Sequence, residues 1–190
     1  MATSSVLFIC LGLGIVVAVL VLGFVALYNR LVQLRNRVEN AWAQIDVQLK
    51  RRYDLIPNIV EIVKGYAAHE KETLEKVVQA RNMAMAATGA GDQGQAENAL
   101  TGALKTLFAV AEAYPELKAN QNFMQLQEEL SNTESKIAYA RQFYNDTVMT
   151  YNTGIQLFPA VIVARLLGFT QKKKHFEAGQ EAAEAPKVSF

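Results

Sequence analysis

The stretch VLFICLGLGIVVAVLVLGFVALY, residues 6–28, decides the fold at the N-terminal end, because its twenty-three residues include no charge. As a helix rising ~1.5 Å per residue it is about 34 Å long, enough to cross a bilayer core of ~30 Å. A cleavable signal peptide has a shorter apolar core, of about 7 to 15 residues, behind a basic start. Residues 1–5 contain no Lys or Arg. The sequence therefore predicts a short N-terminal segment, 1–5, and a transmembrane helix over 6–28.

Basic residues flank only one end of this span. None precedes it, whereas Arg30, Arg35 and Arg37 follow it closely. The positive-inside rule then predicts a single-pass protein with its N-terminus outside and residues 29–190 in the cytoplasm. The chain has one cysteine, Cys10, so disulfide use within the chain does not test this topology.

The 162 residues after the span carry all 19 Lys and Arg and all 18 Asp and Glu. This length is ample for one domain with its own core. The charge is nearly balanced, and the aromatic residues are not interleaved with basic ones as a base-stacking surface requires. We therefore expect no nucleic-acid partner.

Apolar residues continue beyond the span at intervals of seven, without a break at the predicted membrane boundary. The first row contains Phe24, Leu31, Val38 and Ile45, and the second row contains Leu27, Leu34 and Ala41. This spacing predicts that the transmembrane helix continues into the domain as one rod. The segment 51–54 followed by Pro57 predicts a turn, with Asp54 capping a second helix.

The second predicted helix runs from about Leu55 to Ala87 and ends in the glycine-rich segment 88–94, which we expect to be a flexible loop. Its expected apolar side consists of Ile59, Val63, Tyr66, Leu74, Val77 and Val78. A third helix is predicted from about Gln95 to Ala113, because Pro115 disfavours helical geometry at the residue before it.

A long fourth helix is predicted over residues 120–156, with large residues in one row and mostly small ones in the other. The rows are Phe123, Leu130, Ile137, Tyr144, Tyr151 and Phe158, and Leu126, Thr133, Ala140, Thr147 and Gly154. Small residues allow a neighbouring helix to approach closely. Pro159 ends this helix and a short apolar one follows to Gly168.

These patterns together predict an all-α protein. A single N-terminal transmembrane helix continues into an elongated antiparallel bundle of about four helices. The predicted bundle domain is residues 29–176, and the Glu- and Ala-rich residues 177–190 are predicted to be a mobile tail.

The sequence shows no pattern of catalytic or ligand-binding residues. The two histidines, His69 and His175, and one cysteine cannot supply the three or four ligands of a zinc site. No Glu-x-x-His pair occurs, and the segment 88–94 lacks a phosphate-binding Gly-Lys-Ser or Gly-Lys-Thr. The acidic group Glu128, Glu129 and Glu134 is interpreted as a solvated helix face. We expect no enzyme activity, no cofactor and no metal.

Five residues are candidate packing or interaction positions. Trp42, the only tryptophan, is either a core anchor or a contact in an oligomer. Tyr144 and Tyr151 are each followed by Asn, and buried rings whose hydroxyls reach a polar partner are favoured over a binding cage. Leucine in place of Ala140 or Gly154 is expected to overpack the small-residue row and cost about 1 to 3 kcal/mol.

A run of three lysines follows the last apolar helix. Lys172, Lys173 and Lys174 are candidate contacts to anionic lipid, each worth about 1 kcal/mol near a membrane surface. The competing interpretation is a solubilising segment, and the sequence leaves both open.

Several ordered motifs resemble the LemA family. They are YNRLV at 28–32, AWAQIDVQLKRR at 41–52, DLIPN at 54–58, YPELKAN at 114–120, NF at 122–123, residues 134–141, YN at 144–145 and at 151–152, and FP at 158–159. The resemblance extends from the transmembrane helix to about Phe176. It implies a helical bundle anchored in the bacterial inner (cell) membrane, without established catalysis. Some members are linked to membrane organisation, including that of magnetosome membranes, or occur near genes for membrane proteases.

Two functions follow as hypotheses. The first is a non-enzymatic scaffold that self-associates and organises membrane or envelope proteins. The alternative is an adaptor for a membrane-bound enzyme such as a protease. The expected partners are membrane lipid, further copies of the chain, and a membrane protease or another envelope protein.

Overall fold

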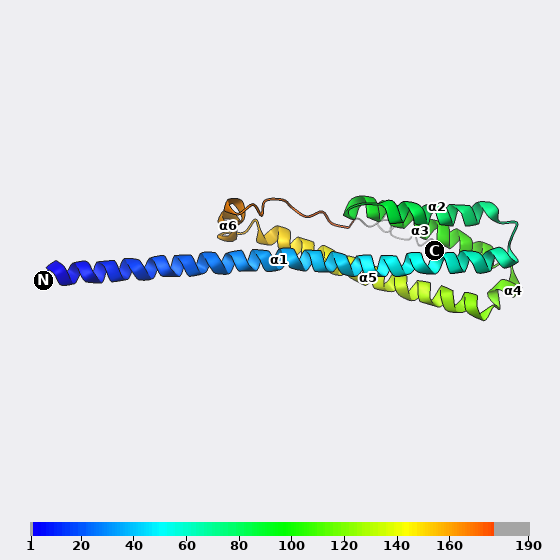
Figure 1. Cartoon of the computed structure of the whole chain (residues 1–190), viewed down its shortest axis with the longest axis horizontal. Coiled ribbons are helices and arrows are strands. Elements are labelled where there is room, and N and C mark those ends of the chain that lie inside the picture. Colours follow the sequence, from blue (N-terminus) through cyan, green and yellow to red (C-terminus); the bar gives the residue numbers. More distant parts are fainter. Residues whose placement is uncertain (1, 177–190) are drawn as a thin grey trace, which may run out of the picture. The chain divides into compact units, whose positions relative to one another are not determined.

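The computed structural model describes the backbone of residues 2–176 and the side chains of residues 10–176. The part described is helical with short connections and contains no strand, so the predicted all-α class is confirmed. The helices are α1 (Ala2–Tyr66), α2 (Lys71–Ala86), α3 (Ala90–Ala111), α4 (Pro115–Lys118), α5 (Gln121–Gly154) and α6 (Ala160–Leu166) (Figure 1). The predicted tail, 177–190, lies outside the described residues.

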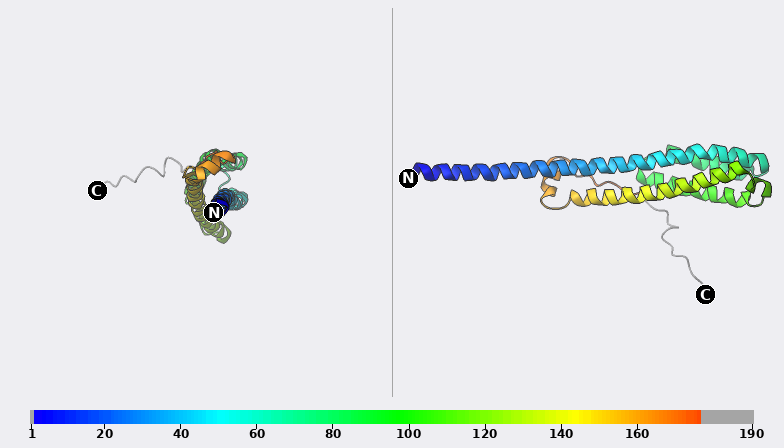
Figure 2. Two further views of the ribbon diagram at one scale, coloured as in Figure 1. Left: turned by 90° about the vertical axis from the view of Figure 1, so that its left-hand side faces the viewer. Right: turned by 90° about the horizontal axis from the view of Figure 1, so that it is seen from below.

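The chain divides into two compact units. Among the described residues, the first contains residues 2–40 and Thr147–Lys173, and the second contains Ala41–Asp146 and residues 174–176. α1 and α5 are each a single helix with residues in both units, and the right-hand view of Figure 2 shows α1 without a break. In the second unit α1, α2, α3 and α5 alternate in direction, which makes this unit an antiparallel bundle (Figure 1).

The first part of α1 exposes its apolar side chains on every side. Leu13, Leu20 and Leu22 are between 64% and 69% exposed, and the most apolar window of the helix has no buried residue. Within residues 10–176, α1 is the helix long and apolar enough to cross a membrane. This agrees with the predicted transmembrane helix.

Beyond this part, α1 buries one stripe of side chains, at the predicted spacing of seven. Leu31, Leu34 and Val38 are buried in the first unit, and Ala41 and Ile45 in the second. Phe24, predicted in the same row, is 40% exposed.

The predicted turn at 51–57 is wrong, because α1 continues through Pro57 to Tyr66 and the chain reverses at residues 67–70 instead. Proline lacks the N–H that would bond the carbonyl of Tyr53 four residues earlier. Arg81 of α2 replaces that donor, with its Nε 2.8 Å from the Tyr53 oxygen. A side chain from a neighbouring helix thus repairs the backbone bond that the proline removes.

The predicted loop at 88–94 is also wrong in its extent, since α3 already begins at Ala90. The connection consists of residues 87–89, in which Gly89 has a φ of 83° that favours glycine. Ala90 and Gly94 are buried, and Gln93 donates to the carbonyl of Ala84 at the end of α2. Packing between α2 and α3 therefore overrides the low helix propensity of glycine in this segment.

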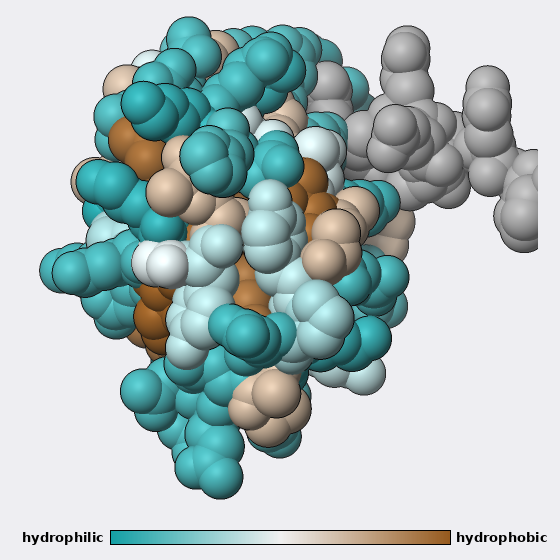
Figure 3. Space-filling model, turned by 90° about the vertical axis from the view of Figure 1, so that its right-hand side faces the viewer, coloured by the Kyte–Doolittle hydropathy of each residue, from teal (hydrophilic) through white to brown (hydrophobic). Residues whose placement is uncertain are grey.

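α5 has the predicted length and buries its row of large residues as far as Tyr151. Phe158 was predicted to continue the row but is 81% exposed, because α5 ends at Gly154. Val78, predicted on the apolar side of its helix, is 41% exposed. The end of the second unit that carries α4 is mainly hydrophilic, with hydrophobic residues in small separate patches (Figure 3).

Candidate interaction site

A buried ion pair joins α1 to α3 in the second unit. Arg52 is 2% exposed and Glu97 is 0% exposed, and Arg52 Nη1 lies 2.7 Å from Glu97 Oε2. Arg52 Nη2 donates to Thr101 at 2.9 Å and to Glu134 of α5 at 2.8 Å. Buried charges are tolerated when they are paired and hydrogen-bonded in this way. Arg52 therefore connects three helices.

Tyr53 and Gln93 extend this cluster. The Tyr53 hydroxyl donates to Glu97, and Gln93 Nε2 donates to the Tyr53 hydroxyl oxygen at 2.9 Å and to the carbonyl of Ala84 at 3.0 Å. Burial raises the pKa of Tyr53 far above its usual value, and the hydrogen bond to Glu97 adds to the rise. Tyr53 thus stays a neutral donor to the carboxylate.

Arg52 and Glu97 are not among the residues selected from the sequence. Glu134, predicted to lie on a solvated helix face, is 43% exposed and also bonds Arg52. Glu97 could have been selected from its spacing in the sequence. Glu97 stands three residues before Leu100 and seven before Leu104, so it occupies the buried row of α3.

Arg141 of α5 links this cluster to the C-terminal end of the described chain. Its Nη2 lies 3.8 Å from Glu97 Oε2, and its guanidinium carbon lies 4.5 Å from the centre of the Phe176 ring. Loss of solvent lowers the pKa of Arg141, while the charge of Glu97 opposes this effect. Arg141 thus makes a cation–π contact on one side and an electrostatic contact on the other.

Phe176 occupies a socket, which we define by Trp42, Arg141, Tyr144 and Asn145. Phe176 is 3% exposed, with its ring 6.1 Å from that of Trp42. Asn145 Oδ1 accepts from the Phe176 N–H at 2.8 Å, and Asn145 Nδ2 donates to the Phe176 carbonyl at 3.0 Å. This paired contact, the amide clamp, resembles one rung of a β-ladder.

Two of the predicted positions lie in this socket. Trp42 is half-buried and makes an edge contact with the Tyr144 ring at 5.4 Å. Tyr144 is buried and its hydroxyl donates to the Lys174 carbonyl at 3.0 Å, as the structural interpretation of this residue expects. Burial raises the pKa of Tyr144.

A second amide clamp lies in the first unit. Asn152 Oδ1 accepts from the Lys173 N–H at 2.9 Å, and Asn152 Nδ2 donates to the Lys173 carbonyl at 2.9 Å. Asn145 and Asn152 both belong to α5, and each is the asparagine of a Tyr-Asn pair.

The remaining predicted positions lie elsewhere. Tyr151 is buried. A Cβ at Gly154 would lie 2.9 Å from Leu34 Cδ1, so a leucine there would collide with a buried neighbour, as the sequence predicts. Lys172 and Lys174 are exposed and Lys173 is half-buried, and lipid contact by these lysines stays a prediction.

Ala140 is half-buried and lies at the α1–α5 groove of the second unit, and overpacking by leucine at this position stays a prediction. The groove has a volume of about 550 Å³. It is lined by Ala43, Gln44, Val47, Gln48, Lys136, Tyr139, Ala140 and Phe143. Tyr139 is 74% exposed and Val47 is 64% exposed. Gln48 Oε1 is buried without a hydrogen-bond partner, although buried acceptors are normally bonded.

Together these features define a class: over the residues that the structure describes, an all-α protein with one helix able to cross a membrane and a bundle with an exposed apolar groove. The model of the LemA family matches residues 41–190, so the chain belongs to the LemA family, as its motifs predict.

Individual relatives agree with this assignment. Protein LemA of Metamycoplasma hominis is 30% identical over 166 residues, which cover 85% of this chain and 73% of that protein. Magnetosome protein MamQ of Magnetospirillum gryphiswaldense is 26% identical over 188 residues, covering 85% of this chain and 68% of its own length. Magnetosome protein MamQ 2 of Paramagnetospirillum magneticum is 25% identical with the same coverage.

Proposed function

We propose that this protein is a membrane-anchored, non-enzymatic scaffold that self-associates and organises membrane or envelope proteins. α1 would anchor it in the bacterial inner membrane, with its N-terminus outside and the bundle in the cytoplasm. The observation that carries the proposal is the α1–α5 groove, where the exposed Val47 and Tyr139 flank the small residues Ala43 and Ala140. Exposed apolar surface of this kind commonly marks an interaction site.

A second copy of the chain is the occupant that we propose for the groove. Copies anchored by the same kind of helix share one membrane, which raises their effective concentration and orients them in parallel. A two-fold axis along the membrane normal then brings the same groove of two copies face to face. Small residues such as Ala43 and Ala140 let helices approach closely at such a contact.

The relatives named as magnetosome proteins support a role in organising a membrane. A scaffold does not need catalytic residues, which fits the absence of catalytic and metal-binding patterns in the sequence.

The test is the mass of the full chain in a nanodisc or mild detergent, measured by native mass spectrometry. We expect the wild type to be an oligomer and Tyr139→Glu to shift it towards monomer. Met124→Glu is the matched control, because Met124 is also an exposed side chain of α5, at 48%, but lies outside the groove. A wild-type monomer that co-purifies with a membrane protease would reject the scaffold in favour of the adaptor.

A further inference from the structure

The corner between α5 and α6, in the first unit, exposes a group of large apolar side chains. These are Leu157 at 57%, Phe158 at 81%, Ile162 at 51%, Leu166 at 70% and Leu167 at 44%. Five exposed apolar residues within eleven positions are a liability in water. We call this group the α6 corner.

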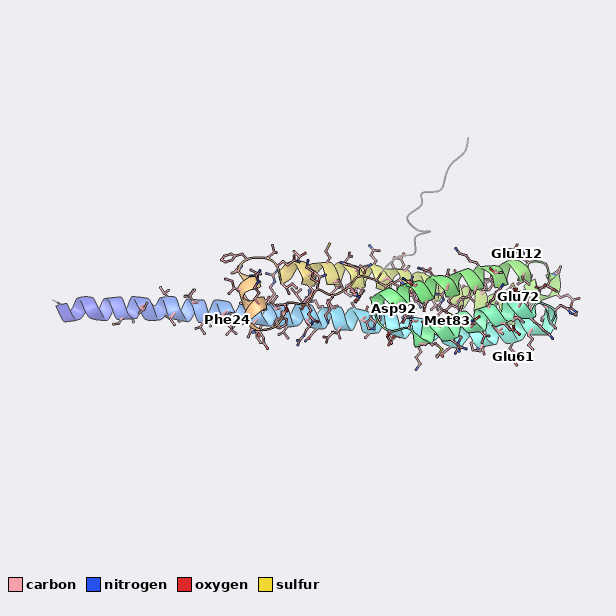
Figure 4. All side chains as sticks on the ribbon, turned by 90° about the horizontal axis from the view of Figure 1, so that it is seen from above. Phe24, Glu61, Glu72, Met83, Asp92 and Glu112 are labelled. Atoms are coloured by element: carbon pink, nitrogen blue, oxygen red, sulfur yellow. The ribbon has the colours of Figure 1, made fainter. Side chains whose placement is uncertain are left out.

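Contacts within the first unit place the α6 corner beside the end of the apolar span. Phe169, two residues after Leu167, packs edge-on against Tyr28 at 6.1 Å, and Tyr28 is the last residue of the uncharged run. Arg35 lies 5.3 Å from the centre of the same Phe169 ring. Figure 4 shows α6 alongside α1 at the labelled Phe24, inside the apolar run. The corner is therefore level with the point where α1 would leave the bilayer.

The first unit contains more basic than acidic residues. Residues 147–173 contain Arg165, Lys172 and Lys173 and no Asp or Glu, and residues 1–40 contain three arginines and only Glu39 as an acid. The whole chain, by contrast, has a formal net charge of only +1. The first unit therefore has a clear excess of basic over acidic residues, and it also holds the apolar span and the apolar corner.

We propose that the α6 corner is a second membrane-binding site, which inserts into the headgroup and acyl boundary of the bilayer that α1 crosses. Its ligand is the surface of a membrane containing anionic phospholipid. The apolar side chains enter the boundary, as in other interfacial helices, and the surrounding Arg and Lys face the phosphates. Tyr28 and Phe158 would lie where aromatic residues gather at membrane interfaces.

This inference rests on the proposed membrane anchor but not on self-association. It extends the anchor from one spanning helix to a spanning helix with an adjacent interfacial element. Such an element would limit the tilt and rotation of α1, because a helix held at two points by the membrane has fewer orientations.

Depth-dependent fluorescence quenching tests the proposal on the full chain in vesicles. On a Cys10→Ser background, Leu157→Cys or Met149→Cys is labelled with an environment-sensitive fluorophore. Leu157 and Met149 are both 57% exposed and both belong to the first unit, so they form a matched pair. The vesicles contain phosphatidylcholine and phosphatidylglycerol, with and without a spin-labelled quencher lipid.

We expect emission from position 157 to be blue-shifted and quenched several-fold more than emission from position 149. Leu166→Cys, labelled in the same way, should give the same result as position 157. This second position shows that the signal does not arise from a local effect of one label. Equal, water-like emission at 157, 166 and 149 would overturn the inference. A blue shift at 157 that persists in detergent and resists the quencher lipid would also overturn it, because the corner would then be covered by protein.

A second arm separates this inference from the proposed function. If quenching at 157 is found while Tyr139→Glu leaves the mass unchanged, the membrane site stands and the scaffold groove fails. Vesicles without phosphatidylglycerol should reduce the quenching at 157, and undiminished quenching there would contradict the part assigned to the basic residues.

Discussion

Two sections of α1 differ in what surrounds them. Over residues 10–26 the apolar side chains point outward on every side and are exposed, whereas over residues 41–66 most apolar side chains form one buried stripe and only a few, such as Val47, are exposed. A helix that is apolar all round suits lipid, and a helix with one apolar stripe suits a bundle in water. One continuous helix therefore has a side-chain pattern suited to lipid in its first section and a pattern suited to a bundle in water in its second section.

The stripe in the second section also contains a charge, Arg52, which the first section never does. The largest test of the contrast is therefore Glu97→Ala, which removes the fully buried carboxylate partner of Arg52 and leaves it only the 43% exposed carboxylate of Glu134. We expect a loss of about 3 to 5 kcal/mol in the free energy of unfolding, measured by urea titration with circular dichroism. Lys76→Ala breaks the exposed pair of Lys76 with Glu72 and should change stability little. Equal losses in the two variants would mean that burial of the cluster is not what stabilises it.

The next test introduces a charge into the first section. Val17→Arg should cost about 2.5 to 3.5 kcal/mol in membrane insertion, because a charge near the centre of a span is poorly solvated. Carbonate extraction of membranes should then release more of the variant than of the wild type. Val47→Arg is the control, since Val47 is 64% exposed in the second section and its replacement should not change the membrane-bound fraction.

Pro57 offers a smaller test, of how the second section stays helical. Arg81→Met removes the donor to the Tyr53 carbonyl and should cost about 1.5 to 3 kcal/mol. In a Pro57→Ala background the restored N–H would bond this carbonyl, so the same substitution should cost much less. A double-mutant cycle measures the difference. If the effects of Arg81→Met and Pro57→Ala on stability were strictly additive, Arg81 would not be replacing the missing backbone donor.

The smallest effect concerns pH. Tyr53 has a raised pKa in the folded chain, whereas an unfolded tyrosine ionises near pH ~10. Its contribution to stability is therefore complete below that pH and is lost as the pH rises above it, because the unfolded state then releases a proton that the folded state keeps. Thermal unfolding at increasing alkaline pH should show a shallower decline for Tyr53→Phe. Tyr139→Phe, at a residue that is 74% exposed, should keep the wild-type slope.

The parts of the fold that depend on local spacing were predictable from the sequence. The buried rows of α1 and α5 follow intervals of seven, and the apolar run 6–28 needs only a count of charges. The proline at position 57 misled the prediction, because the donor that repairs the helix comes from Arg81, twenty-four residues later. The start of α3 was missed for a similar reason, since Gln93 bonds a carbonyl of α2.

The candidate site was less predictable than the fold. Tyr144 and Trp42 could be selected by type and spacing, but Phe176, whose ring packs against Trp42, could not, because it lies in a segment without helical periodicity. Arg52 and Glu97 are polar residues in buried rows, and only the three-dimensional arrangement shows that each satisfies the other. Ala140 illustrates the limit of a heptad pattern, which assigns a residue to a row but does not show whether another helix covers it.

The amide clamp at Asn145 also bears on proteolysis. Proteases bind their substrates as extended chains, through the same backbone N–H and C=O groups that pair in a β-ladder. At Phe176 both groups are already bonded to Asn145, and the ring is held beneath Arg141. Cleavage at this residue would require the clamp to open first, so its rate would follow the open fraction. The clamp therefore defines a point at which C-terminal trimming of the chain should stop.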